Sequence, residues 1–122
     1  MKRDMDLVRK ILIFMSTSDE GPNVDWAAKI PGYTEDQILH HAALMKQGGL
    51  IIAGDYGDLD SALPIALPVC ITWAGHDFLS AVIDDTVWAK AKKTVLAPAA
   101  GATWAVVMEW LKAESLRRLG LS

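Results

Sequence analysis

Two segments constrain what this chain can fold into more than any other part of its sequence. Residues 71–79 have the pattern of a β-strand that runs directly into a helix. Residues 48–51 have the pattern of a helix that stops on two glycines and continues as a strand. A helix, a pair of strands and a further helix, in that order, are typical of a winged helix-turn-helix. We therefore predict a mostly α-helical fold with a small antiparallel β-wing and a C-terminal helical extension.

Apolar periodicity, capping residues and proline breaks set the predicted element boundaries. Thr34 and Gln37 form a capping box at the start of one helix, and Asp84 is a suitable N-cap for another. Pro64 and Pro68 cannot donate hydrogen bonds to a ladder, so the second strand is predicted to be an edge strand or to carry a bulge. The predicted helices span residues 3–15, 24–30, 34–47, 75–83, about 84–96 and 103–119, and the predicted strands span 50–53 and 65–73.

Length and composition fit one ordinary globular domain. With 122 residues, 52% of them hydrophobic and 22% charged, the chain is predicted to form a single domain with its core at about residues 3–96. The lone Cys70 lies between Val69 and Ile71 and is predicted to be a buried thiol in a reducing compartment. The sequence has neither a signal-peptide pattern nor an apolar run long enough for a membrane span, so we expect a cytoplasmic protein without a membrane partner.

Three segments resemble one protein family. They are residues 1–12, residues 49–51 and residues 71–88, the last of which contains a Thr-Trp-x-Gly-His-x-Phe-Leu block beginning at Thr72. The family consists of small bacterial and phage or prophage proteins that are grouped as a domain of unknown function. The resemblance implies a winged-helix-like fold and a mobile-element context, and it implies no activity. The alanine-rich segment 97–102 departs from the family's pattern.

DNA binding is the function most often associated with the predicted fold. The helix at 34–47 would lie in the major groove, where Gln37 has the chemistry to pair with adenine. This face has no arginine, and the net charge of −3 disfavours a polyanion. Basic residues elsewhere would have to contact phosphate, although solvated helix faces are the simpler interpretation. The candidate nucleic-acid-binding residues are Lys2, Arg3, Arg9, Lys10, Gln37, Lys90, Lys92 and Lys93.

Acidic residues favour a second kind of partner. Three aspartates on the predicted wing and one on the helix at 34–47 would repel phosphate. The alternative function is therefore an acidic protein-binding module or inhibitor that occupies a basic, nucleic-acid-like site on a host protein. Its candidate residues, which include a histidine predicted to be exposed, are Asp36, His40, Asp55, Asp58 and Asp60.

The C-terminal helix supplies a further predicted interface. Its residues Trp104, Val107, Met108 and Leu111 form one apolar stripe, while Val106 and Trp110 lie off that stripe. One side can pack on the domain and leave the other as exposed apolar surface. We predict a homodimer through residues 103–119, with candidate contacts Trp104, Val107, Trp110 and Leu111, and burial within one monomer is the alternative. Trp26 and Trp73 are predicted to be core residues, as are Phe78, Leu79, Val82 and Ile83.

The titratable residues form no recognisable catalytic or metal-binding pattern. His40 and His41 are adjacent and point about 100° apart on a helix, so they cannot jointly face one ligand. His41 is predicted to lie at the edge of the core, and Asp77 to lie at the positive end of a helix. Neither a nucleophile nor an oxyanion-forming loop accompanies them. We predict a non-catalytic protein without a cofactor or metal, which acts as an accessory protein of phage or prophage type. DNA-binding transcriptional regulation is the first interpretation and protein binding the alternative.

Overall fold

The computed structural model describes residues 2–17, 30–56, 64–96 and 104–120. The chain divides into two compact units, called here unit 1 (residues 1–77) and unit 2 (residues 78–122), and each is described by itself. The described residues form a mostly helical protein with a small two-stranded antiparallel sheet, as predicted. Residues 24–29 of the predicted helix at 24–30, which include Trp26, lie outside the described residues, as do Asp58 and Asp60.

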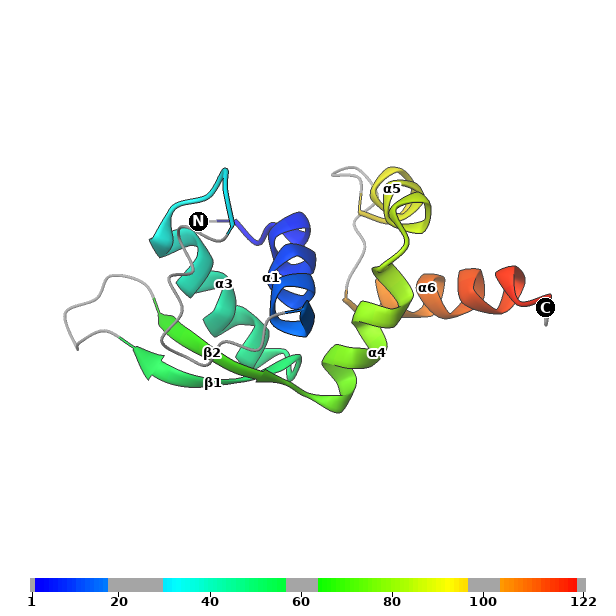
Figure 1. The fold of residues 1–122 in the computed structure, drawn as a ribbon. Helices are drawn as coiled ribbons and strands as arrows, with labels where there is room; N and C mark the ends of the chain where they lie inside the picture. Colours follow the sequence, from blue (N-terminus) through cyan, green and yellow to red (C-terminus); the bar gives the residue numbers. More distant parts are fainter. Residues whose placement is uncertain (1, 18–29, 57–63, 97–103, 121–122) are drawn as a thin grey trace. The chain divides into compact units, whose positions relative to one another are not determined.

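Unit 1 contains a helix pair and the sheet. Its elements are α1 (Met5–Thr17), α3 (Glu35–Gln47), β1 (Ile51–Tyr56) and β2 (Ile65–Ile71), and α4 (Trp73–Val82) begins in this unit. In Figure 1, α3 crosses the two strands and α1 lies beside it, consistent with the packing of α3 against both α1 and β2. The core of the unit lies between them and contains fully buried Leu7, Ile11 and Leu12 of α1 and Ile38 and Met45 of α3.

Local chemistry fixes both ends of α3 as predicted. The Thr34 hydroxyl accepts from the Gln37 N–H at 3.1 Å, and the Gln37 side-chain oxygen accepts from the Thr34 N–H at 2.8 Å. Gly49 follows the helix with φ +78°, a conformation that residues with a Cβ rarely adopt. The Leu50 N–H then donates to the Met45 carbonyl at 2.9 Å, which turns the chain directly into β1.

The sheet carries the bulge that its prolines predict. Ile52 pairs with Cys70 and Ala53 pairs with Pro68, which leaves Val69 as the extra residue of β2. Pro68 has no N–H to donate, so the break in the ladder falls where a backbone donor is missing. Strand β1 extends to Tyr56, beyond the predicted end at residue 53, while β2 ends at Ile71 rather than at residue 73.

Unit 2 is built from the end of α4 and from α5 (Asp85–Thr94) and α6 (Trp104–Arg118). Asp84 caps α5 as predicted, because one carboxylate oxygen accepts from the Thr86 and Val87 N–H groups at 2.8 and 3.0 Å. Phe78, Leu79 and Val82 are buried as predicted. The prediction for Ile83 is wrong: its side chain is 51% exposed because α4 ends at Val82, one residue earlier than the periodicity indicates.

Candidate functional site: an exposed apolar surface on the sheet

A tight junction between β2 and α4 determines where Trp73 lies. The Thr72 N–H donates to the Leu50 carbonyl at 3.0 Å, and the Thr72 hydroxyl donates to the Gly49 carbonyl at 2.5 Å. The same hydroxyl accepts from the Gly75 N–H at 3.0 Å, as an N-cap does. A Cβ on Gly75 would overlap the Leu50 carbonyl oxygen and lie 2.7 Å from the Ile71 Cγ2 atom. Thr72 and Gly75, which flank the Trp73–Ala74 pair, are therefore held against Gly49 and Leu50, directly before β1.

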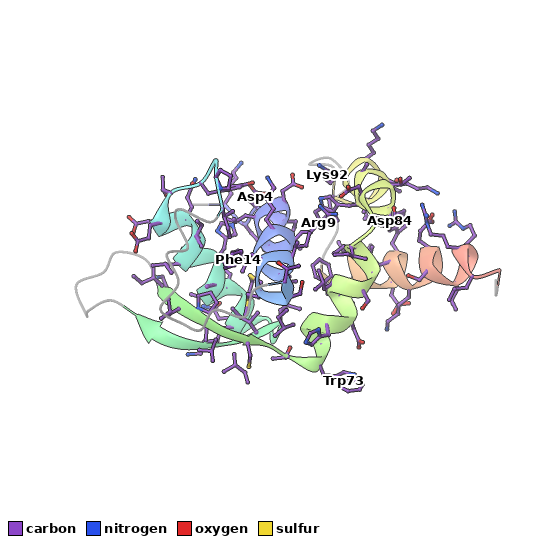
Figure 2. The ribbon with its side chains drawn as sticks, viewed as in Figure 1. Asp4, Arg9, Phe14, Trp73, Asp84 and Lys92 are labelled. Atoms are coloured by element: carbon purple, nitrogen blue, oxygen red, sulfur yellow. The ribbon has the colours of Figure 1, made fainter. Side chains whose placement is uncertain are left out.

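Trp73 itself is 86% exposed, so the prediction that it is a core residue is wrong. The prediction treated it as the last residue of an apolar strand, whereas it is the first residue of α4. Figure 2 shows the Trp73 side chain projecting away from the strands. The structure thus holds a large aromatic side chain in water on a backbone that is fixed on both sides.

Other exposed apolar side chains lie on the sheet that leads to Trp73. Ile52 is 56% exposed and Val69 is 51% exposed. Cys70 is also exposed, which contradicts the prediction of a buried thiol. It pairs with Ile52 across the sheet, so both point away from the face covered by α3, and the bulge at Val69 places Cys70 on that outer side. We call these exposed residues of unit 1 the outer apolar surface: Ile52, Val69, Cys70 and Trp73.

His40 is not part of the exposed face of α3 that was predicted to read DNA. Its side chain is only 7% exposed, so the prediction that His40 lies in solvent is wrong. The ring Nδ1 donates to the Pro64 carbonyl at 2.7 Å, because β2 packs against this side of the helix. Gln37 is half-buried and its amide oxygen is engaged in the capping box, whereas Asp36 is exposed. Asp55 lies in β1, one residue before the strand ends, and its side chain lies outside the described part of the structure.

A network that sequence patterns did not indicate joins α1 to α3 through His41. The side chain is 2% exposed, its Nε2 accepts from the Asp4 N–H at 2.8 Å and its Nδ1 donates to the Gln37 carbonyl at 2.8 Å. Burial lowers the pKa of His41, and the bond to the Gln37 carbonyl opposes that shift. The Asp4 carboxylate caps α1 through the Asp6 N–H at 2.9 Å. It also accepts from the Tyr33 hydroxyl at 3.3 Å, and burial followed by the Asp4 charge raises the pKa of Tyr33.

One of the predicted DNA-contacting lysines is engaged inside unit 2. The Lys90 ammonium lies 3.0 Å from Oε1 of Glu114, a carboxylate that is almost fully buried on α6. Arg117 reaches the other oxygen of Glu114 at 3.1 Å. The hydrogen bond from Lys90 is the main reason why the pKa of Glu114 is lowered. Lys90 is thus placed to hold α5 against α6.

The other predicted basic candidates differ in exposure. Lys92 and Lys93 are exposed on α5. In unit 1, Lys2, Arg3 and Lys10 are exposed and Arg9 is half-buried. The Lys10 ammonium lies 5.2 Å from the centre of the Tyr33 ring. These residues are spread over both units.

On α6, the predicted interface residues separate into two groups. Val107 and Leu111 are buried, and Trp110 is half-buried. Val106 is exposed on the same helix. The Trp104 side chain lies outside the described part of the structure. Burial of Val107 and Leu111 agrees with packing within one copy of the chain, and the exposed Val106 leaves the dimer a prediction.

Formal charge is unevenly divided between the two units. Unit 1 contains eleven acidic and six basic residues, whereas unit 2 contains four acidic and six basic residues. Negative charge therefore belongs to the unit that carries the outer apolar surface. In that unit, Glu35 and Asp36 are exposed at the start of α3, and Asp77 is exposed one turn after Trp73. Asp77 lies in the second turn of α4 rather than at its start, because the helix begins at Trp73.

The described ranges contain neither a cluster of metal-ligating side chains nor a membrane-spanning helix. Within them, no three His, Cys, Asp or Glu side chains are grouped closely enough to hold a metal ion. No helix in the same ranges combines the length and the apolar character needed to cross a bilayer.

The fold and surface define a mostly helical protein with a small two-stranded antiparallel sheet that exposes apolar side chains. The chain belongs to the family described as "Hypothetical protein (DUF2513)", whose model matches residues 2–102. A relative from Haemophilus influenzae (strain ATCC 51907 / DSM 11121 / KW20 / Rd), described as "Uncharacterized protein", is 34% identical over 95 residues. The match covers 78% of this chain and 79% of the relative. No solved structure matches the chain.

Proposed function

We propose that this protein is a non-catalytic protein-binding module on a winged-helix scaffold, with Trp73 as the anchor of its binding surface. The scaffold is supported by the order of α1, α3 and the two strands, in which β1 and β2 form the wing. The accessory role in a mobile-element context, implied by the family resemblance, is part of the same proposal.

The observation that carries the proposal is the 86% exposure of Trp73 between two fixed neighbours. Tryptophan is enriched among the residues that dominate binding energy in protein interfaces. An aromatic side chain on a preorganised backbone loses little further conformational entropy when a partner covers it. Exposed Ile52 and Val69 extend the apolar area available to that partner.

Charge indicates what kind of partner fits this surface. Unit 1 has an excess of acidic residues, and Asp77 lies one turn from Trp73 on α4. Complementary charge increases association rates and disfavours wrong partners. The partner surface is therefore an apolar pocket for an indole ring, surrounded by lysine or arginine. This is the acidic protein-binding alternative, with Trp73 as the contact centre in place of the acidic residues of the helix at 34–47 and the wing.

A DNA-binding regulator is the second candidate, favoured by the exposed Lys92 and Lys93 of α5. The two candidates differ in their response to a generic polyanion. Fluorescence anisotropy of labelled random duplex DNA, titrated from low to physiological salt, tests them directly. The protein-binding proposal expects no binding even at low salt. Binding that weakens steeply with salt would favour the regulator, because such a slope reports phosphate contacts.

The protein-binding arm uses two matched variants. Leu119 is also a large exposed apolar residue, and it lies in unit 2. We expect a partner from cell extract to be retained by wild type and Leu119→Ala and lost by Trp73→Ala. Purified partner should then show the same order of affinities, with weaker binding at high salt. Equal affinity of wild type and Trp73→Ala would refute the role of Trp73.

A further inference from the structure

We propose that His41 is a pH-sensitive latch that fastens the start of α1 to α3, and that protonation of its ring releases this end of α1. The proposal concerns unit 1 alone and does not depend on the proposed function. It is carried by the two hydrogen bonds of a buried imidazole, which together define one protonation state.

The two partners of the ring fix its tautomer. The Gln37 carbonyl can only accept, so the proton must lie on Nδ1, 2.8 Å from that oxygen. The Asp4 N–H can only donate, so Nε2 must present its lone pair at 2.8 Å. His41 in this structure is therefore the neutral Nδ1–H form. A second proton on the ring has one place to go, the nitrogen that accepts from Asp4.

Protonation would replace the hydrogen bond between the Asp4 N–H and His41 Nε2 with a repulsive contact between two donors. The new Nε2–H would face the Asp4 N–H, and two donors cannot share a hydrogen bond. The side chain is 2% exposed, so the charged ring could not be hydrated in place. Separation of the Asp4 backbone from the ring relieves both problems, since the amide and the imidazolium can then each bind water.

The groups around His41 decide the direction of the switch. On the α1 side this is the carboxylate of Asp4, whose charge favours a cationic ring. One Asp4 oxygen caps α1 and the other accepts from Tyr33. On α3, the His40 ring lies 6.0 Å away between centroids, and β2 has no charged residue. Burial outweighs the attraction and lowers the pKa of His41, so the latch is closed at neutral pH and opens in acid.

Release of Asp4 would reach the first turn of α1. The Asp4 carboxylate accepts from the Asp6 and Leu7 N–H groups at 2.9 and 3.3 Å, and its carbonyl accepts from the Val8 N–H at 3.1 Å. Movement of Asp4 away from α3 breaks or weakens this cap. Exposed Lys2 and Arg3 precede the cap and would move with it.

NMR of the full chain tests the latch and requires no ligand. The ring-nitrogen spectrum of uniformly 15N-labelled protein reports tautomer and titration for each histidine. We expect neutral His41 to carry its proton on Nδ1 and to have a pKa below the ordinary histidine value of about 6.5. Amide exchange at Asp4 and Leu7 should rise roughly two- to tenfold relative to Gln37 as His41 titrates, the factor expected for loss of one hydrogen bond.

A His41→Gln variant separates the latch from simple acid destabilisation. Glutamine offers an uncharged acceptor that does not titrate, so exchange at Asp4 relative to Gln37 should become independent of pH in this variant. A proton on Nε2 in neutral His41 would overturn the proposal. It would also be overturned if His41 titrated without any change in Asp4 exchange relative to Gln37, a measurement that needs only the wild-type protein.

Discussion

The contact between Gly75 and Leu50 gives the most direct test of the β2–α4 junction. A methyl group at position 75 would overlap the Leu50 carbonyl oxygen and crowd the Ile71 side chain. A backbone carbonyl cannot rotate away as a flexible side chain can. The start of α4 would therefore have to move, and the two bonds that Thr72 makes to Gly49 and Leu50 would be strained or lost.

The expected cost of Gly75→Ala is the sum of these effects. Insertion of one carbon into a filled site costs about 1–3 kcal/mol, and each lost hydrogen bond adds about 0.5–1.5 kcal/mol. We expect the free energy of unfolding to fall by about 2–6 kcal/mol, measured by urea denaturation with far-UV circular dichroism. This is a large share of the stability of a small protein.

Gly48→Ala is the matched control for the same substitution. A Cβ there would lie 3.6 Å from the Leu44 oxygen and 3.8 Å from the Met45 oxygen, and φ is −79°. Both values suit alanine, so we expect no loss and a gain of up to about 1 kcal/mol from reduced freedom of the unfolded chain. If Gly75→Ala and Gly48→Ala unfolded at the same urea concentration, the steric account of the junction would be refuted.

Three further predictions concern different parts of the chain. Trp73→Ala should change the free energy of unfolding by no more than about 0.5 kcal/mol in the same urea experiment, because the side chain is solvated. Unit 2 should lose stability in acid. The pKa of Asp84 is lowered chiefly by the Val87 N–H, and the pKa of Glu114 is lowered chiefly by Lys90. The two carboxylates therefore contribute to stability above about pH 5, and this contribution is lost as the pH falls through their lowered pKa values. Thermal unfolding as a function of pH measures this, and Asp84→Ala should reduce the slope. A homodimer through residues 103–119 predicts twice the chain mass in light scattering at micromolar concentration, and a monomeric mass would reject it.

Features that depend on neighbouring residues in the chain were predicted well from the sequence. The capping box at Thr34 and Gln37 and the cap at Asp84 need only two or three consecutive backbone groups. The bulge at Val69 follows from the missing N–H of Pro68. In each case the chemistry that defines the feature lies within a few residues, so it does not depend on the tertiary fold.

Features that depend on which element covers which face were predicted poorly. Periodicity predicts that His40 lies on the outer side of α3. In the structure β2 packs against that side, and the carbonyl of Pro64, directly before β2, accepts a hydrogen bond from the His40 ring. The bond between Asp4 and His41 joins residues 37 positions apart, and no local pattern reports such a pairing. The cap of α1 did have a local signal: Asp4 is an aspartate, a preferred N-cap residue, placed three residues before buried Leu7.

The Thr-Trp-x-Gly segment shows how structural and binding roles can be separated within four residues. Thr72 is accounted for by its hydrogen bonds to Gly49, Leu50 and Gly75, and Gly75 by its contact with a carbonyl oxygen. Neither these bonds nor this contact require an indole at position 73, because the Trp73 side chain is exposed to solvent. A substitution at Gly75 should therefore reduce stability, and any loss of binding should follow from unfolding. A substitution at Trp73 should reduce binding in a protein that remains as stable as wild type, which is the combination expected of an interface anchor.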